Sequence, residues 1–412
     1  MRVLVIGGGA SGLMAAIHAA RAGAEVTVLE SMEKPGKKLL ATGNGRCNLT
    51  NQSAGDARYY RSSEKGVQEV LKGYTPKETL ADFAGLGLFV QEKQEGCMYP
   101  ASGQASSVLD LLLMEAAARK VKIKCLEKAE KIWKKDRVWQ VKTSGWQYEA
   151  EKVILACGSQ AAPALGADGS GYVLAKMTGH TIEKPLPALV PLKIKDKDIR
   201  QLEGVRTPAE ICLKTRKGSF RETGELQWTA YGISGIVVFQ VSRYAVKALE
   251  EREQAVVSVN LLKGMGIMPE EAQKKMERVL ALSGNKKNEE LLAGLFAKKM
   301  IPFLTKRAGF KERQNASRES IEKLLLASSD IRLEVSGFKS FDAAQCCQGG
   351  VLLSQVDLST MESKKAEGLY VTGELLDVDG PCGGYNLQWA WSTGARAGDH
   401  AGRDSERERK WI

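Results

Sequence analysis

The first thirty residues follow the pattern of a buried strand, a glycine-rich turn, a helix and a second strand. Residues 3–6 read Val-Leu-Val-Ile, a run typical of a strand that is buried on both faces. Small residues between positions 10 and 22 predict a closely packed helix that Gly23 ends. Residues 25–29 predict the next strand, and this order indicates two neighbouring parallel strands.

The turn after the first strand carries Gly7, Gly9 and Gly12 at the spacing GxGxxG. In this motif the first glycine allows a tight turn, the second lets the backbone approach a pyrophosphate, and the third lets helix and strand pack closely. Amides at the helix start then face the phosphates. Glu30 follows the second strand, where a carboxylate accepts a hydrogen bond from a ribose 2′-OH and repels a 2′-phosphate. The motif predicts FAD or NAD, and disfavours NADP at this site.

Later segments favour FAD. Residues 36–51 form a polar, glycine-rich loop that can lie along a long dinucleotide. Residues 153–158 predict a buried strand with a small-residue turn, and residues 368–374 predict another that ends in Glu374, a candidate for a ribityl hydroxyl. Residues 383–395 predict a helix whose first amides could face the N1/O2 edge of a flavin, where negative charge grows on reduction.

The middle of the chain has a different pattern. Pro185 and Pro187 predict a crossover out of the dinucleotide-binding fold, which resumes near residue 343. Asn288 and Ser317 are predicted N-caps within a helical stretch that starts at Pro269. Further helices are expected at 64–72, 76–85, 106–119 and 235–250, and strands at 189–195, 209–215, 220–229, 256–261 and 331–335.

Composition and charge add limits to this picture. The chain has 412 residues and a net charge of +11, which favours anionic partners without choosing among them. No apolar run is long enough for a membrane span, and the eight cysteines include no CxxC pair, so we expect a cytoplasmic protein with reduced thiols. The three histidines lack the spacing of metal ligands, so no metal site is expected.

The sequence resembles the HI0933-like family of FAD-dependent oxidoreductases, which is also described as aminoacetone oxidase-like or bile-acid-reductase-like. The resemblance runs from end to end, and residues 43–51 and 380–388 are specific to it. The matching stretches are 7–30, 36–51, 166–180, 224–235 and 360–398.

This resemblance implies an α/β fold in which a glutathione-reductase-type, Rossmann-like FAD-binding domain is interrupted by a β-barrel-like domain and a small helical domain. The expected boundaries are 1–187 with 343–412 for the FAD domain, 188–260 with 330–342 for the barrel, and 261–329 for the helices. The expected ligand is non-covalent FAD. Its candidate binding residues are Gly7, Gly9, Ala10, Ser11, Gly12, Glu30, Lys38, Asn44, Arg46, Cys47, Asn48, Ala129, Ala156, Gly158, Gly373, Glu374, Gly384, Asn386 and Leu387.

The chain departs from the family pattern in two places. It reads Cys346-Cys347 where the family often has Val-Thr, and Thr229-Ala230 where the family often has Thr-His. Both places are expected near the flavin, so the substrate cannot be carried over from any one relative.

The candidate catalytic residues are Arg46, Cys47, Tyr231 and Tyr385. A Cys47 thiolate could act as nucleophile or redox partner, but packing of a small thiol is the favoured interpretation. Tyr231 and Tyr385 could each donate a proton to substrate, or be ordinary buried tyrosines.

The function expected from these features is hydride transfer between flavin and a small organic substrate. The first form is an NADH- or NADPH-dependent reductase of an activated C=C or C=N bond. The alternative is an amine-type oxidase that uses O2, and a third is an FAD-containing protein that binds RNA or protein. Residues 261–329 hold 14 Lys and Arg against 8 Glu, yet no RNA-binding motif is present, so nucleic acid is not the expected partner. The oligomeric state is left open.

Overall fold

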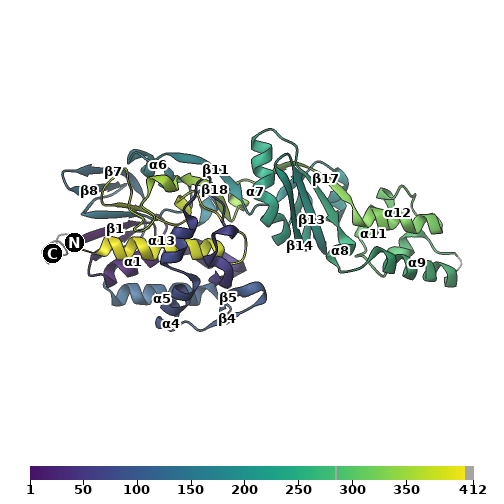
Figure 1. The fold of residues 1–412 in the computed structure, drawn as a ribbon, viewed down its shortest axis with the longest axis horizontal. Helices are drawn as coiled ribbons and strands as arrows, with labels where there is room; N and C mark the ends of the chain where they lie inside the picture. The colour runs from purple at the N-terminus through teal and green to yellow at the C-terminus, as the bar shows by residue number, and fades with distance from the viewer. Residues whose placement is uncertain (284, 404–412) are drawn as a thin grey trace. The chain divides into compact units, whose positions relative to one another are not determined.

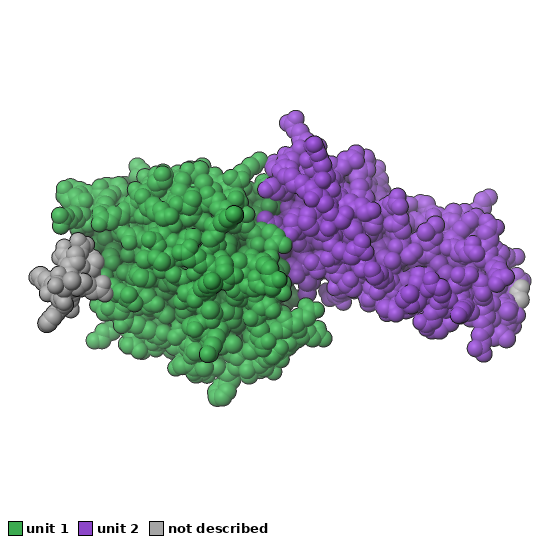
Figure 2. Space-filling model, in the orientation of Figure 1, with its two compact units in different colours: residues 1–187, 345–412 green, residues 188–344 purple. Residues whose placement is uncertain are grey.

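The computed structural model describes residues 1–283 and 285–403, which form two compact units. The first unit joins residues 1–187 to residues 345–412, and the second comprises residues 188–344 (Figure 2). The α/β fold expected from the sequence is confirmed: one unit is a Rossmann-type domain, and the other contains a closed barrel and helices. The finer division of the second unit into two domains stays a prediction.

The first unit is built on a parallel sheet with the strand order β19-β10-β1-β2-β6. The central strand β1 (Arg2–Ile6) pairs with β2 (Glu25–Leu29) on one side and β10 (Lys152–Leu155) on the other. The outer strands are β6 (Lys122–Lys124) and β19 (Leu369–Val371). Residues 3–6 are all buried, because helices and a second sheet cover the two faces. The carboxyl ends of the central strands therefore meet at one edge.

Two helices, α1 (Ala10–Arg21) and α13 (Tyr385–Gly402), lie side by side in this unit (Figure 1). Both follow the sequence prediction, although α13 runs past the expected end. The unit also contains α2 (Lys37–Ala41), α3 (Val67–Gly73), α4 (Pro76–Gly85), α5 (Ala105–Ala118) and α6 (Ser170–Met177).

Three glycines on α13 allow its backbone to touch that of α1. A Cβ on Gly394 would lie 2.4 Å from the Ser11 carbonyl oxygen, and one on Gly398 would lie 2.4 Å from the Ala15 carbonyl oxygen. A Cβ on Gly402 would lie 2.6 Å from the Ala19 carbonyl oxygen. Because residue numbers rise together on both helices, the helices are parallel, and their positive ends point the same way.

Several small sheets of the first unit were not expected from the sequence. An antiparallel sheet consists of β7 (Ala129–Lys135), β8 (Val138–Thr143) and β9 (Gln147–Ala150), and another of β3 (Thr50–Asn51), β5 (Cys97–Pro100) and β4 (Val90–Glu92). The predicted crossover at Pro185 and Pro187 lies inside β11 (Ile182–Ala188), whose one partner among the described strands is β18 (Cys346–Val351). Proline is tolerated there because an edge strand has unpaired amides.

The second unit contains a closed barrel in the order β12-β15-β14-β13-β16-β17. Its apolar interior includes Trp228, Ile211 and Leu333, and α7 (Ile236–Glu250) packs against it. The strands are β12 (Leu192–Ile194), β13 (Arg206–Thr215), β14 (Gly218–Thr229), β15 (Gly232–Ser234), β16 (Val256–Asn260) and β17 (Ile331–Phe338).

Five helices complete the second unit: α8 (Leu261–Gly264), α9 (Pro269–Ser283), α10 (Asn288–Leu292), α11 (Met300–Arg307) and α12 (Arg318–Ser329). Ser317 caps α12 as predicted, since its hydroxyl accepts from the Ser320 amide. The prediction for Asn288 is wrong by one residue. Lys287 holds the N-cap position, and Asn288 is the first, fully buried residue of α10.

Across the described ranges, no helix combines the length and apolar character that a membrane crossing would require.

A buried histidine links α1 to two other helices of the first unit. His18 Nδ1 lies 2.9 Å from Asp399 Oδ1 on α13, and Nε2 lies 3.0 Å from Asp82 Oδ2 on α4. Tyr74 and Arg21 also donate to Asp82. Burial alone lowers the pKa of His18, but the hydrogen bonds to the two carboxylates outweigh it and raise the pKa. Both ring nitrogens face carboxylate acceptors, so both hydrogen bonds form only when the ring is a protonated imidazolium. We call this pair of hydrogen bonds, which joins α1 to α13 and α4, the imidazolium clamp.

We expect His18 to make the stability of the protein fall as pH rises. A raised folded-state pKa means that the contribution is present in full below about pH 6.5 and is lost as pH passes through the raised value. His18→Gln should lower the free energy of unfolding by about 2 kcal/mol at pH 6. The difference from wild type should shrink towards pH 9 in denaturant titrations.

His180→Gln is the matched control, because His180 is buried too but lies between the Thr178 and Ser363 hydroxyls, and its pKa is lowered. Its cost should not change between pH 7 and 9. A pH-independent cost for His18→Gln would contradict the imidazolium clamp.

Candidate functional site

The glycine turn after β1 has the geometry that its spacing predicts. A Cβ on Gly12 would lie 1.9 Å from the Gly7 carbonyl oxygen, and one on Gly7 would lie 2.4 Å from the Ala156 carbonyl oxygen. A Cβ on Gly9 would meet nothing within 4 Å. Two glycines are therefore required by packing, while Gly9 borders open space where a ligand can approach the backbone.

The starts of α1 and α13 both lack a side-chain cap and an acidic residue in the first turn. Their first amides are thus available to an anionic or electron-rich ligand. Gly394 lies opposite Ser11, so α13 has nine residues before this contact and α1 has one. The start of α13 at Tyr385 therefore extends eight residues further than the start of α1 at Ala10. At about 1.5 Å per residue, α13 begins about 12 Å ahead of α1. Two positive helix ends at this offset suit an extended dinucleotide.

Glu30 is buried at the end of β2, beside the glycine turn. Its carboxylate accepts from the Gly8 amide at 2.8 Å and from the Met32 amide at 2.8 Å. The Glu127 amide donates to the Glu30 carbonyl oxygen, which brings the start of β7 at Ala129 towards Glu30. These contacts fix the carboxylate and leave lone pairs for a ribose hydroxyl.

Glu374 lies just beyond β19, where an ion pair joins it to Lys38. Lys38 Nζ donates to Glu374 Oε2 at 2.6 Å, and the Ser159 hydroxyl donates to the same oxygen at 3.1 Å. Lys38 and Glu374 were each predicted from the sequence as FAD-binding residues, but their ion pair was not predicted, and Ser159 was not among the candidates. Ser159 follows the Ala156–Gly158 turn directly, and the rule that ligands bind beyond the carboxyl ends of parallel strands could have found it.

Four residues of the loop at 42–48 have a left-handed backbone conformation. Gly43, Asn44 and Gly45 have φ of 57°, 55° and 82°, and Cys47 has φ of 56°. This conformation costs a non-glycine residue about 1–2 kcal/mol, so surrounding contacts must hold the loop in place. Asn44 and Arg46 are exposed, whereas Cys47 and Asn48 are buried.

The start of α13 closes against that loop. Gly384 has φ of 96°, and a Cβ there would lie 2.6 Å from the Thr50 carbonyl carbon and 2.9 Å from the Asn48 side chain. The two stretches that are most specific to the family thus meet in space. The Asn386 side chain accepts from the Gly380 amide and donates to the Gly380 carbonyl oxygen, so this side chain is already engaged within the turn.

The candidate catalytic residues differ in their surroundings. Burial raises the pKa of the Cys47 thiol to about 12, and burial with the nearby Tyr59 raises the pKa of Tyr385 to about 12. Both stay protonated at neutral pH, which disfavours a Cys47 thiolate. Arg46 is exposed in the loop. Tyr231 belongs to the second unit, where Lys339 Nζ lies 4.0 Å from its ring centre.

The two cysteines that depart from the family pattern are buried thiols on β18. Burial raises the pKa of Cys346, and it raises the pKa of Cys347 to about 11. Glu374 and Lys38 contribute smaller opposing effects to both, so β18 lies close to the Lys38–Glu374 pair. Ala230, the other departure, lies on the barrel between β14 and β15.

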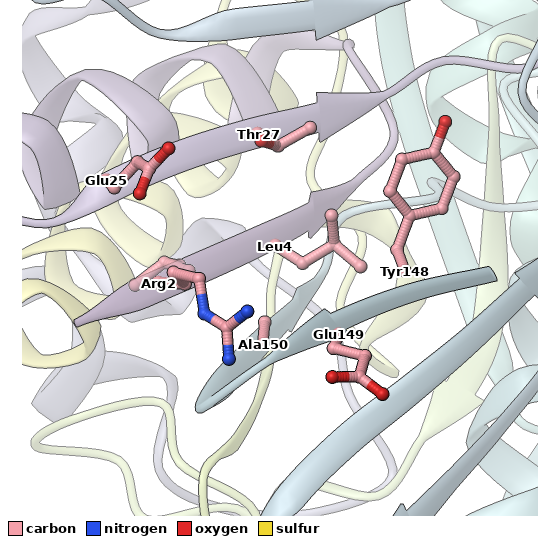
Figure 3. Close-up of a pocket in the computed structure, with 8 residues that line it drawn as sticks. Arg2, Leu4, Glu25, Thr27, Tyr148, Glu149 and Ala150 are labelled. Carbon is pink, nitrogen blue, oxygen red and sulfur yellow. The ribbon is translucent and has the colours of Figure 1, made fainter.

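A separate small cavity of about 60 Å³ lies beside the amino-terminal halves of β1 and β2. Arg2 and Glu25 line one end and Tyr148 the other (Figure 3). A water molecule occupies about 30 Å³ of liquid, so this cavity has room for a few waters but not for a dinucleotide. It also lies away from the carboxyl-end edge, and we assign it no role.

The described residues fit FAD on three observations: the open space at Gly9, the two uncapped helix starts, and the fixed carboxylate of Glu30. A parallel sheet with such an edge is typical of Rossmann-type dinucleotide-binding domains, and the chain is a flavin-dependent oxidoreductase built on one. The family model for the HI0933-like protein Rossmann domain matches residues 1–400. The chain therefore belongs to the HI0933-like family.

Curated relatives match nearly the whole chain. A 3-dehydro-bile acid delta(4,6)-reductase of Clostridium scindens is 44% identical over 403 residues, which cover 96% of this chain and 98% of that protein. A ribosomal RNA dihydrouridine synthase of Haemophilus influenzae is 29% identical, with coverage of 95% and 96%. The protein of the same name from Escherichia coli is 27% identical, with coverage of 95% of each chain.

We expect Glu30→Ala to weaken FAD binding by about 1.5–3 kcal/mol, the range for a hydrogen bond to a charged group. The affinity for FMN should hardly change, because FMN lacks the adenosine ribose. Glu30→Gln tests the loop contacts, since its amide oxygen can still accept from one backbone amide. Flavin fluorescence titration of the apoprotein measures both ligands, and an unchanged FAD dissociation constant would refute the role.

We expect Cys47→Ala to keep the rate of flavin reduction within about twofold of wild type, because a neutral buried thiol supplies no nucleophile. Its main effect should be a modest loss of stability. Anaerobic stopped-flow absorbance measures the rate, and a loss of tenfold or more would give the thiol a part in the chemistry.

Proposed function

We propose that the chain is an FAD-dependent reductase that transfers hydride to a carbon–carbon double bond conjugated with a carbonyl group, with NADH or NADPH as the electron donor. The observation that carries the proposal is the uncapped start of α13, where Gly384 allows close packing against Asn48 and Thr50. Amides at a fixed helix start stabilise negative charge on a reduced flavin. Bound FAD supplies the hydride step itself.

The names of the relatives support this substrate class. A delta(4,6)-reductase of a 3-dehydro bile acid saturates double bonds conjugated with a ketone. Formation of dihydrouridine saturates the double bond of the uracil ring, which is conjugated with a ring carbonyl. Hydride addition to a polarised C=C bond is common to both, and a C=N bond would accept hydride for the same reason.

The protein would then orient and polarise the substrate. Arg46 is exposed, and its guanidinium is the candidate for binding the carbonyl oxygen and stabilising the enolate charge. Tyr385 keeps its proton up to a pKa of about 12, so it can donate a hydrogen bond but cannot act as a base near neutral pH. Tyr231, which was predicted from the sequence alone, is a second candidate for donating a proton to the substrate.

Non-covalent FAD would occupy the GxGxxG motif at residues 7–30. NADH or NADPH would therefore bind over the flavin, without a Rossmann motif of its own. Donor and substrate would then compete for one place. We expect ping-pong kinetics, with parallel double-reciprocal lines and inhibition by excess substrate, and weak binding of the nicotinamide cofactor. Intersecting lines with a separately saturable NADPH site would contradict this arrangement.

Anaerobic stopped-flow tests the function directly. Reduced protein, prepared with NADH or NADPH, is mixed with a 3-oxo-4-ene bile acid, and reoxidation of the flavin is followed by absorbance. If neither nicotinamide reduces the flavin while an amine does so and O2 reoxidises it, the amine oxidase alternative replaces the reductase.

Ribosomal RNA is the second candidate substrate. It is favoured by the two dihydrouridine synthase relatives and by the excess of basic residues between 261 and 329. The same reduced protein should then convert uridine to dihydrouridine in unmodified ribosomal RNA, as measured by nucleoside mass spectrometry. A larger turnover with RNA than with the bile acid would make RNA the substrate, whereas a protein that only binds RNA would give no dihydrouridine.

A further inference from the structure

Tyr99 was not among the residues predicted from the sequence, and the structure places it beside the loop at 42–48. It lies on β5, and a Cβ on Gly43 would be 3.6 Å from Tyr99 Cε1. The Leu49 amide donates to the Met98 carbonyl oxygen at 2.8 Å, so β5 stays paired with the chain up to the end of this loop. The ring of Tyr99 therefore lies against one of the two stretches that are most specific to the family.

The same face of β5 also reaches the start of α13. Cys97 and Tyr99 are two residues apart on the strand, so their side chains lie on one face. Cys97 Sγ lies 3.8 Å from the carbonyl oxygen of Gly383, which directly precedes the N-cap of the helix. The proposed function places the flavin at this helix start, so Tyr99 is on the strand face that borders the flavin.

Two basic residues lie next to the Tyr99 side chain. Lys93 Nζ lies 4.8 Å from the centre of its ring, where the ring face attracts a cation and the contact restrains the ring. Burial raises the pKa of Tyr99, and the Arg46 guanidinium and the Asn48 side chain offset part of this rise. The hydroxyl therefore keeps its proton near neutral pH, and a positive charge is close by to stabilise the oxygen once the proton has left.

Exposure separates Tyr99 from the tyrosine at the start of α13. Tyr385 is only 7% exposed, and its ring contacts the rings of Tyr59 and Tyr60. Tyr99 is half-buried, so part of its side chain is accessible to a substrate. A proton donor must come within hydrogen-bond reach of the reacting group, and Tyr99 meets this condition better than Tyr385.

We propose that Tyr99 is the catalytic proton donor in the reduction of the conjugated double bond, an inference that rests on the proposed function. The carbon β to the carbonyl group accepts a hydride from reduced FAD, and the electron pair of the C=C bond moves to give an enolate. The O–H bond of Tyr99 then breaks, and its proton forms a C–H bond at the α carbon. The tyrosinate that remains takes a proton from water, and Arg46 stabilises the negative charge of both anions.

Tyr99→Phe removes the hydroxyl and keeps the ring beside Gly43 and Lys93. Anaerobic stopped-flow absorbance measures the two half-reactions separately. Reduction of the flavin by NADH or NADPH should stay within about twofold of wild type, because this half-reaction needs no proton from Tyr99. Reoxidation by a 3-oxo-4-ene bile acid should slow by about a hundredfold or more, because an enolate that receives no proton returns its hydride.

A nitroalkene distinguishes proton donation from placement of the substrate. Nitrocyclohexene accepts hydride to give a nitronate, an anion that is stable without a proton on carbon. It should therefore reoxidise Tyr99→Phe and wild type at the same rate. An equal loss of rate with the nitroalkene and the bile acid would overturn the inference, because the hydroxyl would then position the substrate or the flavin.

Tyr59→Phe is the matched control. Tyr59 is 43% exposed and its ring centre lies 5.1 Å from that of Tyr385, so it is another accessible tyrosine near the start of α13. Loss of its hydroxyl should change neither half-reaction. If reduced wild type is reoxidised by neither the bile acid nor uridine in RNA, the proposed function itself fails. If one of them reoxidises wild type and Tyr99→Phe at the same rate, this inference alone is overturned.

Discussion

The backbone contact between α1 and α13 is the constraint on which the cofactor site depends. Glycines at 394, 398 and 402 bring α13 so close to α1 that a Cβ at any of them would lie within 2.6 Å of a carbonyl oxygen. Close packing fixes both the direction and the register of the two helices. Because the helices are parallel and offset, their positive ends form two separate anchor points along one line. A larger residue at these positions would move one anchor away from the other.

The two carboxylates near these helix starts, Glu30 and Glu374, have hydrogen-bond partners within the protein even without a bound ligand. Glu30 is held by two backbone amides, and Glu374 by Lys38 and Ser159. A buried carboxylate without such partners would take up a proton or destabilise the fold. Pre-formed contacts also reduce the entropy lost on binding, because the side chains are already ordered. The start of α13 packs against the residues that follow the left-handed loop, where Gly384 approaches Asn48 and Thr50.

The chemistry that the site can supply follows from its scarcity of reactive side chains. Cys47, Cys346 and Cys347 are all neutral buried thiols, and Tyr385 keeps its proton. Such a site has few acids or bases that change state near neutral pH. Binding, orientation and electrostatic stabilisation are therefore the main contributions of the chain, and the flavin carries the electron transfer.

The sequence by itself determined the strand–helix–strand unit at its N-terminus, the glycine roles, the interrupted α/β fold and the flavin class. The first two depend on local backbone limits and on short periodic patterns, which single residues such as Gly12 report directly, whereas the interrupted fold and the flavin class also rest on the resemblance to the family. Tertiary structure alone decided the pairing of Lys38 with Glu374, the contact of Ser159 with Glu374, and the hydrogen bonds of His18 to Asp82 and Asp399. Each of these contacts joins segments that are far apart in the chain. The sequence shows that the residues are polar, but it does not show whether a polar side chain contacts solvent or another side chain. The small sheets at 50–51 and 90–150 were missed because their strands are only two to seven residues long, so pairing with neighbouring strands, and not a local pattern, made them strands.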